Sequence, residues 1–184
     1  MERKEALELM RKYIKNEKLI YHCLATEAVM RALAKHFNED ENKWALAGLL
    51  HDLDVELTNA DLNVHGLESE RILSEINIDK DIIDAIKMHN EKAHGIKRNK
   101  LFHYALAAGE TITGLIFATA LVYPDKKIEN VKTKSITKRM KEKAFAASVS
   151  REIIMECELI GLPLDTFTEI CLNAMKEIAK DIGL

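Results

Sequence analysis

The feature of this sequence that most limits its fold is the scarcity of residues that turn or break a chain. Only seven glycines and two prolines occur among 184 residues, and both prolines, Pro124 and Pro163, lie late in the chain. No segment alternates apolar and polar residues in a way that favours a strand over a helix. We therefore predict an all-α fold of helices joined by short loops, and a chain of this length can bury one substantial core.

Apolar residues that recur every three or four positions predict where the helices lie. The expected helices cover residues 3–15, 17–37, 42–53, about 65–76, 79–89 and 101–123, with one or two more in 141–161 and a last one from about 165. Residues 54–63 and 90–100 are expected to be connectors. Asp79 is predicted to cap its helix, and Thr166 with Glu169 has the spacing of a capping box.

The most apolar stretch, residues 104–124, could be taken for a membrane span. Glu110 and several threonines interrupt it and no second span accompanies it, so we expect a buried central helix and no membrane. Residues 1–15 alternate charged and apolar side chains, unlike a signal peptide. The three cysteines form no CxxC pair, which argues against a disulfide framework or a sulfur-ligated zinc site and favours the cytoplasm: Cys23, Cys157 and Cys171. The net charge of −3 argues against bulk binding of nucleic acid.

The stretch GLLHDLDVE, residues 48–56, changes abruptly from leucines to side chains that can bind metals. His51 and Asp52 are adjacent, and two such residues can reach one cation where a helix ends and its backbone can splay. Other residues of these types lie at helix ends or on apolar helix faces: His22, His65, His89 and Glu110. A carboxylate within an apolar helix has to be neutralised or paired, and a metal ion would do so. Imidazoles and carboxylates without a thiolate suit Fe, Mn, Zn or Mg.

The order of these residues resembles the HD superfamily of metal-dependent phosphohydrolases, whose minimal pattern is a histidine, an HD doublet and a distant acid. His22 matches the first histidine, His51 and Asp52 match the doublet, and Glu110 stands where the last acid belongs. Members with two metals add two histidines, and His65 and His89 lie where those would fall. The runs TGLIFATALVYPDKK and KSITKRMKEKAFAASVSRE are similar to an uncharacterised bacterial and archaeal branch of the superfamily.

Two departures accompany the resemblance. The last acid of the family is usually Asp, where this chain has Glu110, and many members carry IGK after the doublet, where this chain has Leu53, Asp54 and Val55. The resemblance implies one HD-type helical bundle over residues 1–184, with a core of about 17–123 and a C-terminal helical extension of about 124–184.

The resemblance also implies a ligand set and a reaction. One divalent ion would be held by His22, His51, Asp52 and Glu110, and Asp52 would bridge to a second ion held by His65 and His89; a one-ion site needs only the first four. His51 and Asp52 are the expected catalytic residues. The implied activity is hydrolysis of a phosphate ester or anhydride of a small substrate, expected to be a nucleotide, by a metal-activated water. One alternative is a dinucleoside polyphosphate hydrolase. The other is a non-catalytic HD module that binds metal or nucleotide, and Glu110 in place of the usual Asp is the reason to retain it.

Other polar residues carry weaker expectations. Residues 126–143 are strongly basic, and they form either a solvated face or a phosphate pocket. The pocket would use Lys134, Arg139 and Lys143. His94 is either a connector residue or a proton donor, whereas His36 and His103 are expected to be structural. Asp54 and Glu56 are expected to support ligands or to be exposed. The helix faces are apolar enough for a homodimer, although no heptad run requires one.

Overall fold

The computed structural model describes all 184 residues and contains helices but no strand, which confirms the all-α fold. The α-helices are α1 (Arg3–Tyr13), α2 (Glu17–Phe37), α3 (Glu41–Leu50), α4 (Leu67–Glu75), α5 (Lys80–Met88), α6 (Leu101–Leu121), α7 (Thr133–Arg139), α8 (Arg151–Met155) and α9 (Leu164–Glu177). Four short 3₁₀ helices are η1 (Glu91–Ala93), η2 (Ile128–Asn130), η3 (Glu156–Ile160) and η4 (Ala179–Ile182).

Several helix boundaries differ from those expected. The Asp79 side chain accepts from the Asp81 amide at the start of α5, so this predicted cap is confirmed. The predicted capping box in α9 is wrong, because the helix begins at Leu164, directly after Pro163, and has no side-chain cap. Residues 140–150 form turns and not a helix. Regular helix in this part of the chain is therefore limited to the short α8 and η3.

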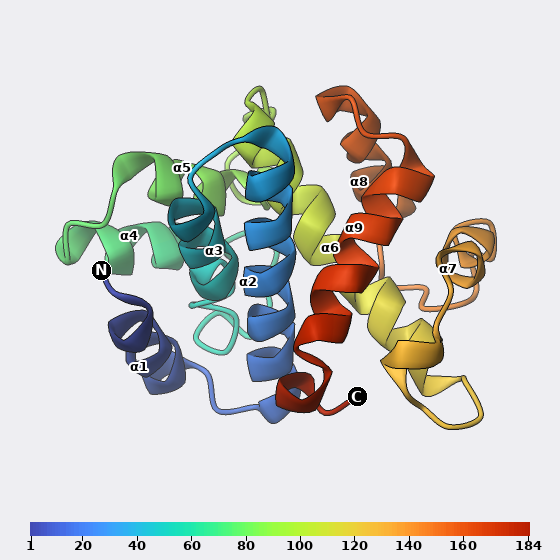
Figure 1. Cartoon of the computed structure of the whole chain (residues 1–184). Helices are drawn as coiled ribbons and strands as arrows, with labels where there is room; N and C mark the ends of the chain where they lie inside the picture. The colour runs from blue at the N-terminus through green and yellow to red at the C-terminus, as the bar shows by residue number, and fades with distance from the viewer.

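Helix α2 runs through the middle of the molecule, with α3 and α6 packed against it and α9 beside it (Figure 1). Helix α6 is long and apolar enough to cross a membrane, but most of its residues are buried among the other helices. It is thus the central core helix that the sequence predicted. One continuous cluster of buried apolar residues joins α2 and α6 to the C-terminal helices.

Two glycines let neighbouring helices approach α2 closely. A Cβ on Gly48 of α3 would lie 2.6 Å from the carbonyl oxygen of Thr26, which belongs to the α2 backbone. A Cβ on Gly109 of α6 would meet only the ends of side chains on α2, at 3.2 to 3.3 Å. Because backbone cannot give way as a side chain can, Gly48 fixes how closely the end of α3 lies against α2.

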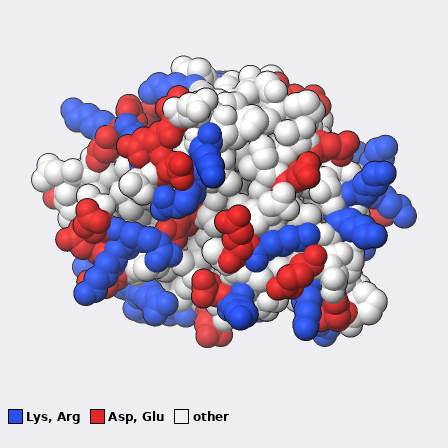
Figure 2. All heavy atoms as spheres, in the orientation of Figure 1, with Lys and Arg blue, Asp and Glu red and all other residues white.

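The surface carries charges of both signs. Figure 2 shows Lys and Arg interspersed with Asp and Glu over the face that Figure 1 presents, without a continuous basic area. Residues 122–184 include α7, α8 and α9, and all three of these helices pack against α6 (Figure 1). Together with the connector between α5 and α6, this C-terminal part leaves a cavity next to the middle of α6.

Candidate metal centre

Four histidines from four parts of the chain surround the carboxylate of Asp52. His22 lies in the second turn of α2, His51 and Asp52 follow α3, His65 lies in the loop before α4, and His89 ends α5. Each Nε2 atom approaches Asp52: that of His65 is 3.1 Å from Oδ1, that of His51 is 3.4 Å, that of His89 is 3.8 Å, and that of His22 is 3.6 Å from Oδ2. Asp52 therefore lies at the centre of the cluster.

The histidines form two pairs. The Nε2 atoms of His22 and His51 are 3.1 Å apart, and those of His65 and His89 are 3.0 Å apart. Each pair, taken with Asp52, offers three ligand atoms within 4.8 Å of one another. Two ligands bound to one ion at about 2.1 Å lie roughly 3.0 to 3.4 Å apart in octahedral or tetrahedral geometry. The spacing within each pair is thus that of neighbouring ligands of one ion.

In the first pair, Nδ1 of each ring forms a hydrogen bond on the side facing away from Asp52. The Thr113 hydroxyl donates to the Glu110 carbonyl at 2.7 Å, so its oxygen accepts from Nδ1 of His22 at 2.8 Å. Nδ1 of His51 lies 2.8 Å from the Gly48 carbonyl and can only donate to it. These partners place a proton on Nδ1 and turn Nε2 toward Asp52.

The second pair is held in the same way. Nδ1 of His65 donates to Oδ1 of the buried Asp54 at 2.7 Å, and Asp54 Oδ2 accepts from the amides of Gly66 and Ser69. Nδ1 of His89 donates to the Ile86 carbonyl at the end of α5. All four imidazoles therefore have an outward Nδ1–H and an inward Nε2, the arrangement that metal-binding histidines adopt.

Burial and charge set the protonation of the cluster. Burial lowers the pKa of His22 to about 4 and that of His89 to about 3, so both rings are neutral at pH 7. Burial also lowers the pKa of His65, but hydrogen bonds to Asp52 and Asp54 outweigh it and raise the value to about 10. Burial raises the pKa of Asp52, yet the surrounding histidines hold it well below its usual range. An ion at the second pair must therefore displace a proton from His65.

The residues present fit a divalent metal. The Nδ1 partners direct the Nε2 atoms of each pair at each other across about 3 Å, an arrangement that a shared cation or a shared proton stabilises. The donors are imidazole nitrogens and carboxylate oxygens, and no cysteine sulfur is among them. This set suits Fe, Mn, Zn or Mg, as the sequence predicted. The cluster is therefore compatible with a divalent ion.

Glu110 lies at the edge of this centre. Its Oε2 atom is 3.7 Å from Nε2 of His22, and its Oε1 atom accepts from the Thr111 hydroxyl. It belongs to neither of the two compact groups of ligand atoms. Burial raises the pKa of its carboxyl group to about 8. The structure thus brings Glu110 next to His22, outside the two compact groups of ligand atoms.

A cavity of about 770 Å³ opens beside the centre. Besides Leu62 and the α6 residues Thr111 and Gly114, residues from three parts of the structure line it. The centre contributes His22, Asp52, His65, His89 and Glu110; the connector after α5 contributes Asn90, Glu91, Lys92, Gly95, Lys97 and Arg98; the C-terminal part contributes Ser148, Val149, Ser150, Ile153 and Glu156. The buried Arg98 joins the last two groups, because its guanidinium pairs with Glu156 at 2.7 and 2.8 Å and also donates to the His89 carbonyl.

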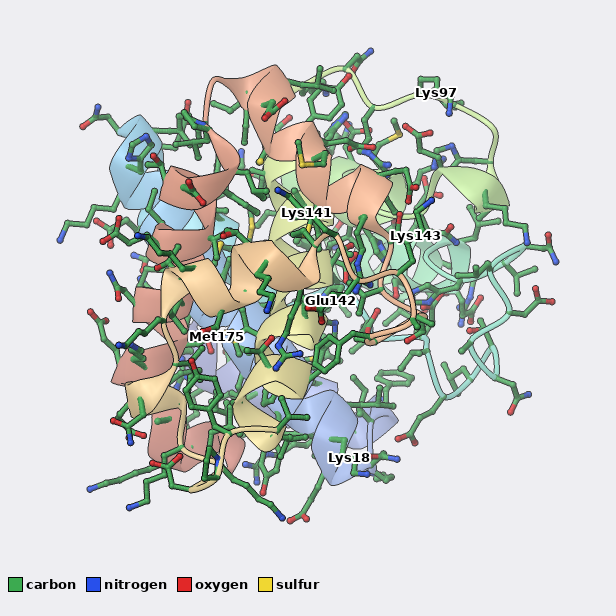
Figure 3. All side chains as sticks on the ribbon, turned by 90° about the vertical axis from the view of Figure 1, so that its right-hand side faces the viewer. Lys18, Lys97, Lys141, Glu142, Lys143 and Met175 are labelled. Carbon is green, nitrogen blue, oxygen red and sulfur yellow. The ribbon has the colours of Figure 1, made fainter.

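The structure places the three residues named for a phosphate pocket in the basic segment outside this cavity. None of Lys134, Arg139 and Lys143 lines the cavity. Lys134 and Lys143 are exposed, and the Arg139 guanidinium lies 4.1 Å over the Phe145 ring. Figure 3 shows Lys141 and Lys143 on the turns that follow α7. The cations that line the cavity come instead from the connector after α5: Lys92, Lys97 and Arg98.

His94 does not line the cavity, and its contacts are those of a connector residue, one of the two expected roles. Its Nε2 donates to the Lys87 carbonyl at 3.2 Å, and its Nδ1 accepts from the Ile96 amide at 3.0 Å. Both nitrogens are thus used to hold the connector. His36 is exposed and His103 bonds Asp84, so neither joins the cluster. Glu56 is half-buried and accepts from the backbone amides of Lys15 and Asn16, just before α2.

The sequence reasoning missed two residues that support the centre. Thr113 was not considered, although it lies one helical turn after Glu110 and so shares its face of α6. Gly48 was read only as part of an apolar run, although its carbonyl accepts from His51 and its missing side chain admits the α2 backbone. A small residue three positions before a doublet histidine is a weak signal without a structure.

Comparison with known proteins agrees with this geometry. No solved structure matches the chain. The family model of the HD domain matches residues 19–121, which is more than half of the chain and spans His22 through Glu110. Members of this family are mostly metal-dependent hydrolases. The chain therefore belongs to the HD domain family.

Proposed function

We propose that this protein is a metal-dependent phosphohydrolase with two divalent ions. His22, His51, Asp52 and Glu110 would hold the first ion, and Asp52, His65 and His89 the second. The observation that carries the proposal is the convergence of four Nε2 atoms on one buried carboxylate, each ring anchored through Nδ1. When bound, the ions would supply an acidified water for attack on phosphorus and positive charge for the phosphoryl oxygens.

The residues of the chain itself have separable tasks in this proposal. Asp52 presents Oδ1 to His51, His65 and His89 and Oδ2 to His22, so that a single carboxylate contacts both pairs of histidines. The Nδ1 partners keep the rings from turning, which avoids reorganisation when substrate enters. Lys92 lines the cavity and makes no ion pair with a carboxylate, so it is available to attract a phosphorylated substrate.

The proposed substrate is a small phosphate ester or anhydride, with nucleotides as the first class to test. The cavity volume accommodates such a compound. Dinucleoside polyphosphates are the alternative substrate. The three cysteines are buried and free, which supports the proposal of a cytoplasmic protein.

A non-catalytic HD module is the second candidate function. It is favoured by Glu110, which stands apart from the compact ligand groups and replaces the Asp usual in the family. In this case the centre would bind metal or nucleotide without turnover.

The test is a hydrolysis panel with protein stripped of metal and reloaded with Mn²⁺, Mg²⁺, Fe²⁺ or Zn²⁺. Substrates are p-nitrophenyl phosphate, its bis ester, nucleoside mono-, di- and triphosphates and dinucleoside polyphosphates. We expect cation-dependent release of phosphate or nitrophenol that is lost in Asp52→Ala and kept in Glu56→Gln, an acid of the same loop that belongs neither to the ligand groups nor to the cavity lining. Stoichiometric metal without turnover of any substrate would favour the non-catalytic module.

A further inference from the structure

We propose that the turn segment 140–150 is the substrate-recognition wall of the cavity and that Arg151 is the residue that positions it. The inference rests on the proposed function. It concerns residues that lie beyond the part of the chain matched by the HD family model, residues 19–121. The wall residues themselves are Ser148, Val149 and Ser150, all of which line the cavity.

The segment is folded around the guanidinium of Arg151. Nη1 donates to the carbonyls of Ala146 and Val149, each at 2.7 Å. Nη2 donates to the Phe145 carbonyl and lies 3.4 Å from those of Arg139 and Glu142, where α7 ends. Five backbone carbonyls spread over 11 positions thus meet one side chain. No helix or strand supplies comparable hydrogen bonds in this segment.

Two further contacts fix the wall. The Ser150 hydroxyl accepts from the Ile153 amide and caps α8, the helix that Arg151 begins. Cγ2 of Val149 lies where it would be 3.2 Å from a Cβ on Gly114 of α6. Gly114 lies one turn after Glu110 and also lines the cavity. The missing side chain at position 114 therefore lets the segment close against α6 beside the metal centre.

The chemistry of the wall suits the organic part of a substrate. Ser148 offers a hydroxyl group, while Val149 and the neighbouring Ile153 offer apolar contact, and none of the three is charged. The ligand-type side chains come instead from the centre, and the cations come from the connector after α5. We therefore expect the wall to select what the phosphoryl group is attached to.

Arginine is suited to this role and lysine is not. The planar guanidinium presents several N–H groups in a fixed fork, whereas an ammonium is a single point that cannot reach five separated carbonyls at once. Arg151→Lys keeps the charge and most of the apolar stem. It should therefore loosen the segment without removing a side chain from the core.

The experiment compares the wild type with Arg151→Lys and Ser148→Ala, using Lys138→Gln as the control for an exposed cation on α7. Limited trypsin digestion of the metal-loaded proteins reports order, because Lys141 and Lys143 are exposed cleavage points within the segment. Steady-state kinetics with the best substrate of the panel separate KM from kcat. Elemental analysis checks that the metal content of each variant is unchanged.

We expect Arg151→Lys to be cleaved several-fold faster after Lys141 or Lys143, and its KM to rise about tenfold with kcat within a factor of about three. Ser148→Ala should raise KM without faster cleavage, and Lys138→Gln should match the wild type. If KM is unchanged in both Arg151→Lys and Ser148→Ala, even though Arg151→Lys is cleaved faster, the recognition role is overturned. A wild type that loads metal but hydrolyses nothing would instead overturn the proposed function, whatever the digestion shows.

Discussion

The metal centre and the recognition wall are built by opposite means. At the centre, His22 lies in a helix, His51 and His89 directly follow helices and His65 lies in the turn before α4, and each ring is fixed by one hydrogen bond from Nδ1. At the wall, regular structure is absent, and one arginine gathers the carbonyls of successive turns. The ligands of the centre tolerate little movement, whereas the sequence of the wall can change while the chemistry at the centre stays the same.

This difference predicts that variants at the centre change metal binding, while variants at the wall change substrate affinity alone. The following substitutions test the centre half of the comparison, beginning with the one expected to have the largest effect.

Asp52→Ala should abolish hydrolysis and release both ions. Asp52 lies between both pairs of histidines, and its removal leaves four rings without the carboxylate that they share. Elemental analysis after purification without chelators measures the loss. Retention of full metal content in this variant would mean that the ion lies elsewhere.

Asp54→Asn should lower the affinity for the second ion about ten- to hundredfold, because the carboxylate that accepts from Nδ1 of His65 is replaced by a neutral amide. Competition with a chelator of known affinity measures the change in the metal dissociation constant. Glu56→Gln, in the same loop, should leave that constant unchanged. Equal affinities in Asp54→Asn and the wild type would contradict a metal-binding role for His65.

Gly48→Ala should lower the free energy of unfolding by about 1 to 3 kcal/mol, because the new Cβ overlaps the Thr26 carbonyl in the α2 backbone. Gly109→Ala is the matched control. Its Cβ meets only side-chain ends, and the gain of about 1 kcal/mol in helix propensity offsets their displacement. Urea denaturation should therefore give a lower free energy of unfolding for Gly48→Ala than for Gly109→Ala. Equal free energies of unfolding would show that α3 and α2 can move apart to accommodate the new side chain.

Thr113→Val should have the smallest effect, a decrease of about tenfold in affinity for the first ion, since Nδ1 of His22 loses its acceptor. Chelator competition again measures it. The affinity for the second ion should not change, because Thr113 does not contact His65 or His89. A uniform decrease at both sites would indicate a general loosening of α6 and not a local effect on His22.

The sequence predicted the fold and the grouping of the six ligand candidates because each signal was local or ordered along the chain. Apolar periodicity located α2 and α6, and the order of His22, His51, Asp52 and Glu110 carried the family resemblance. The same reasoning failed at residues 140–150, where the folded form depends on Arg151 reaching back to carbonyls up to 12 positions away. Periodicity cannot predict such a contact.

The cations that line the cavity could not be found from the sequence for a related reason. A concentration of lysines along the sequence does not say which way each side chain points, and Arg139 lies on Phe145 instead of facing the cavity. Lys92 and Arg98 line the cavity, but they lie in a short mixed-charge connector that gives no signal of its own.

The measurement that tests the account most directly is the metal stoichiometry of the wild type, with His65→Ala and His22→Ala beside it. We predict about two equivalents of divalent metal in the wild type after loading with Mn²⁺ or Fe²⁺, and about one equivalent in each variant. Less than one equivalent in the wild type under every cation would contradict the proposed centre and leave the convergent histidines as a buried hydrogen-bonded cluster.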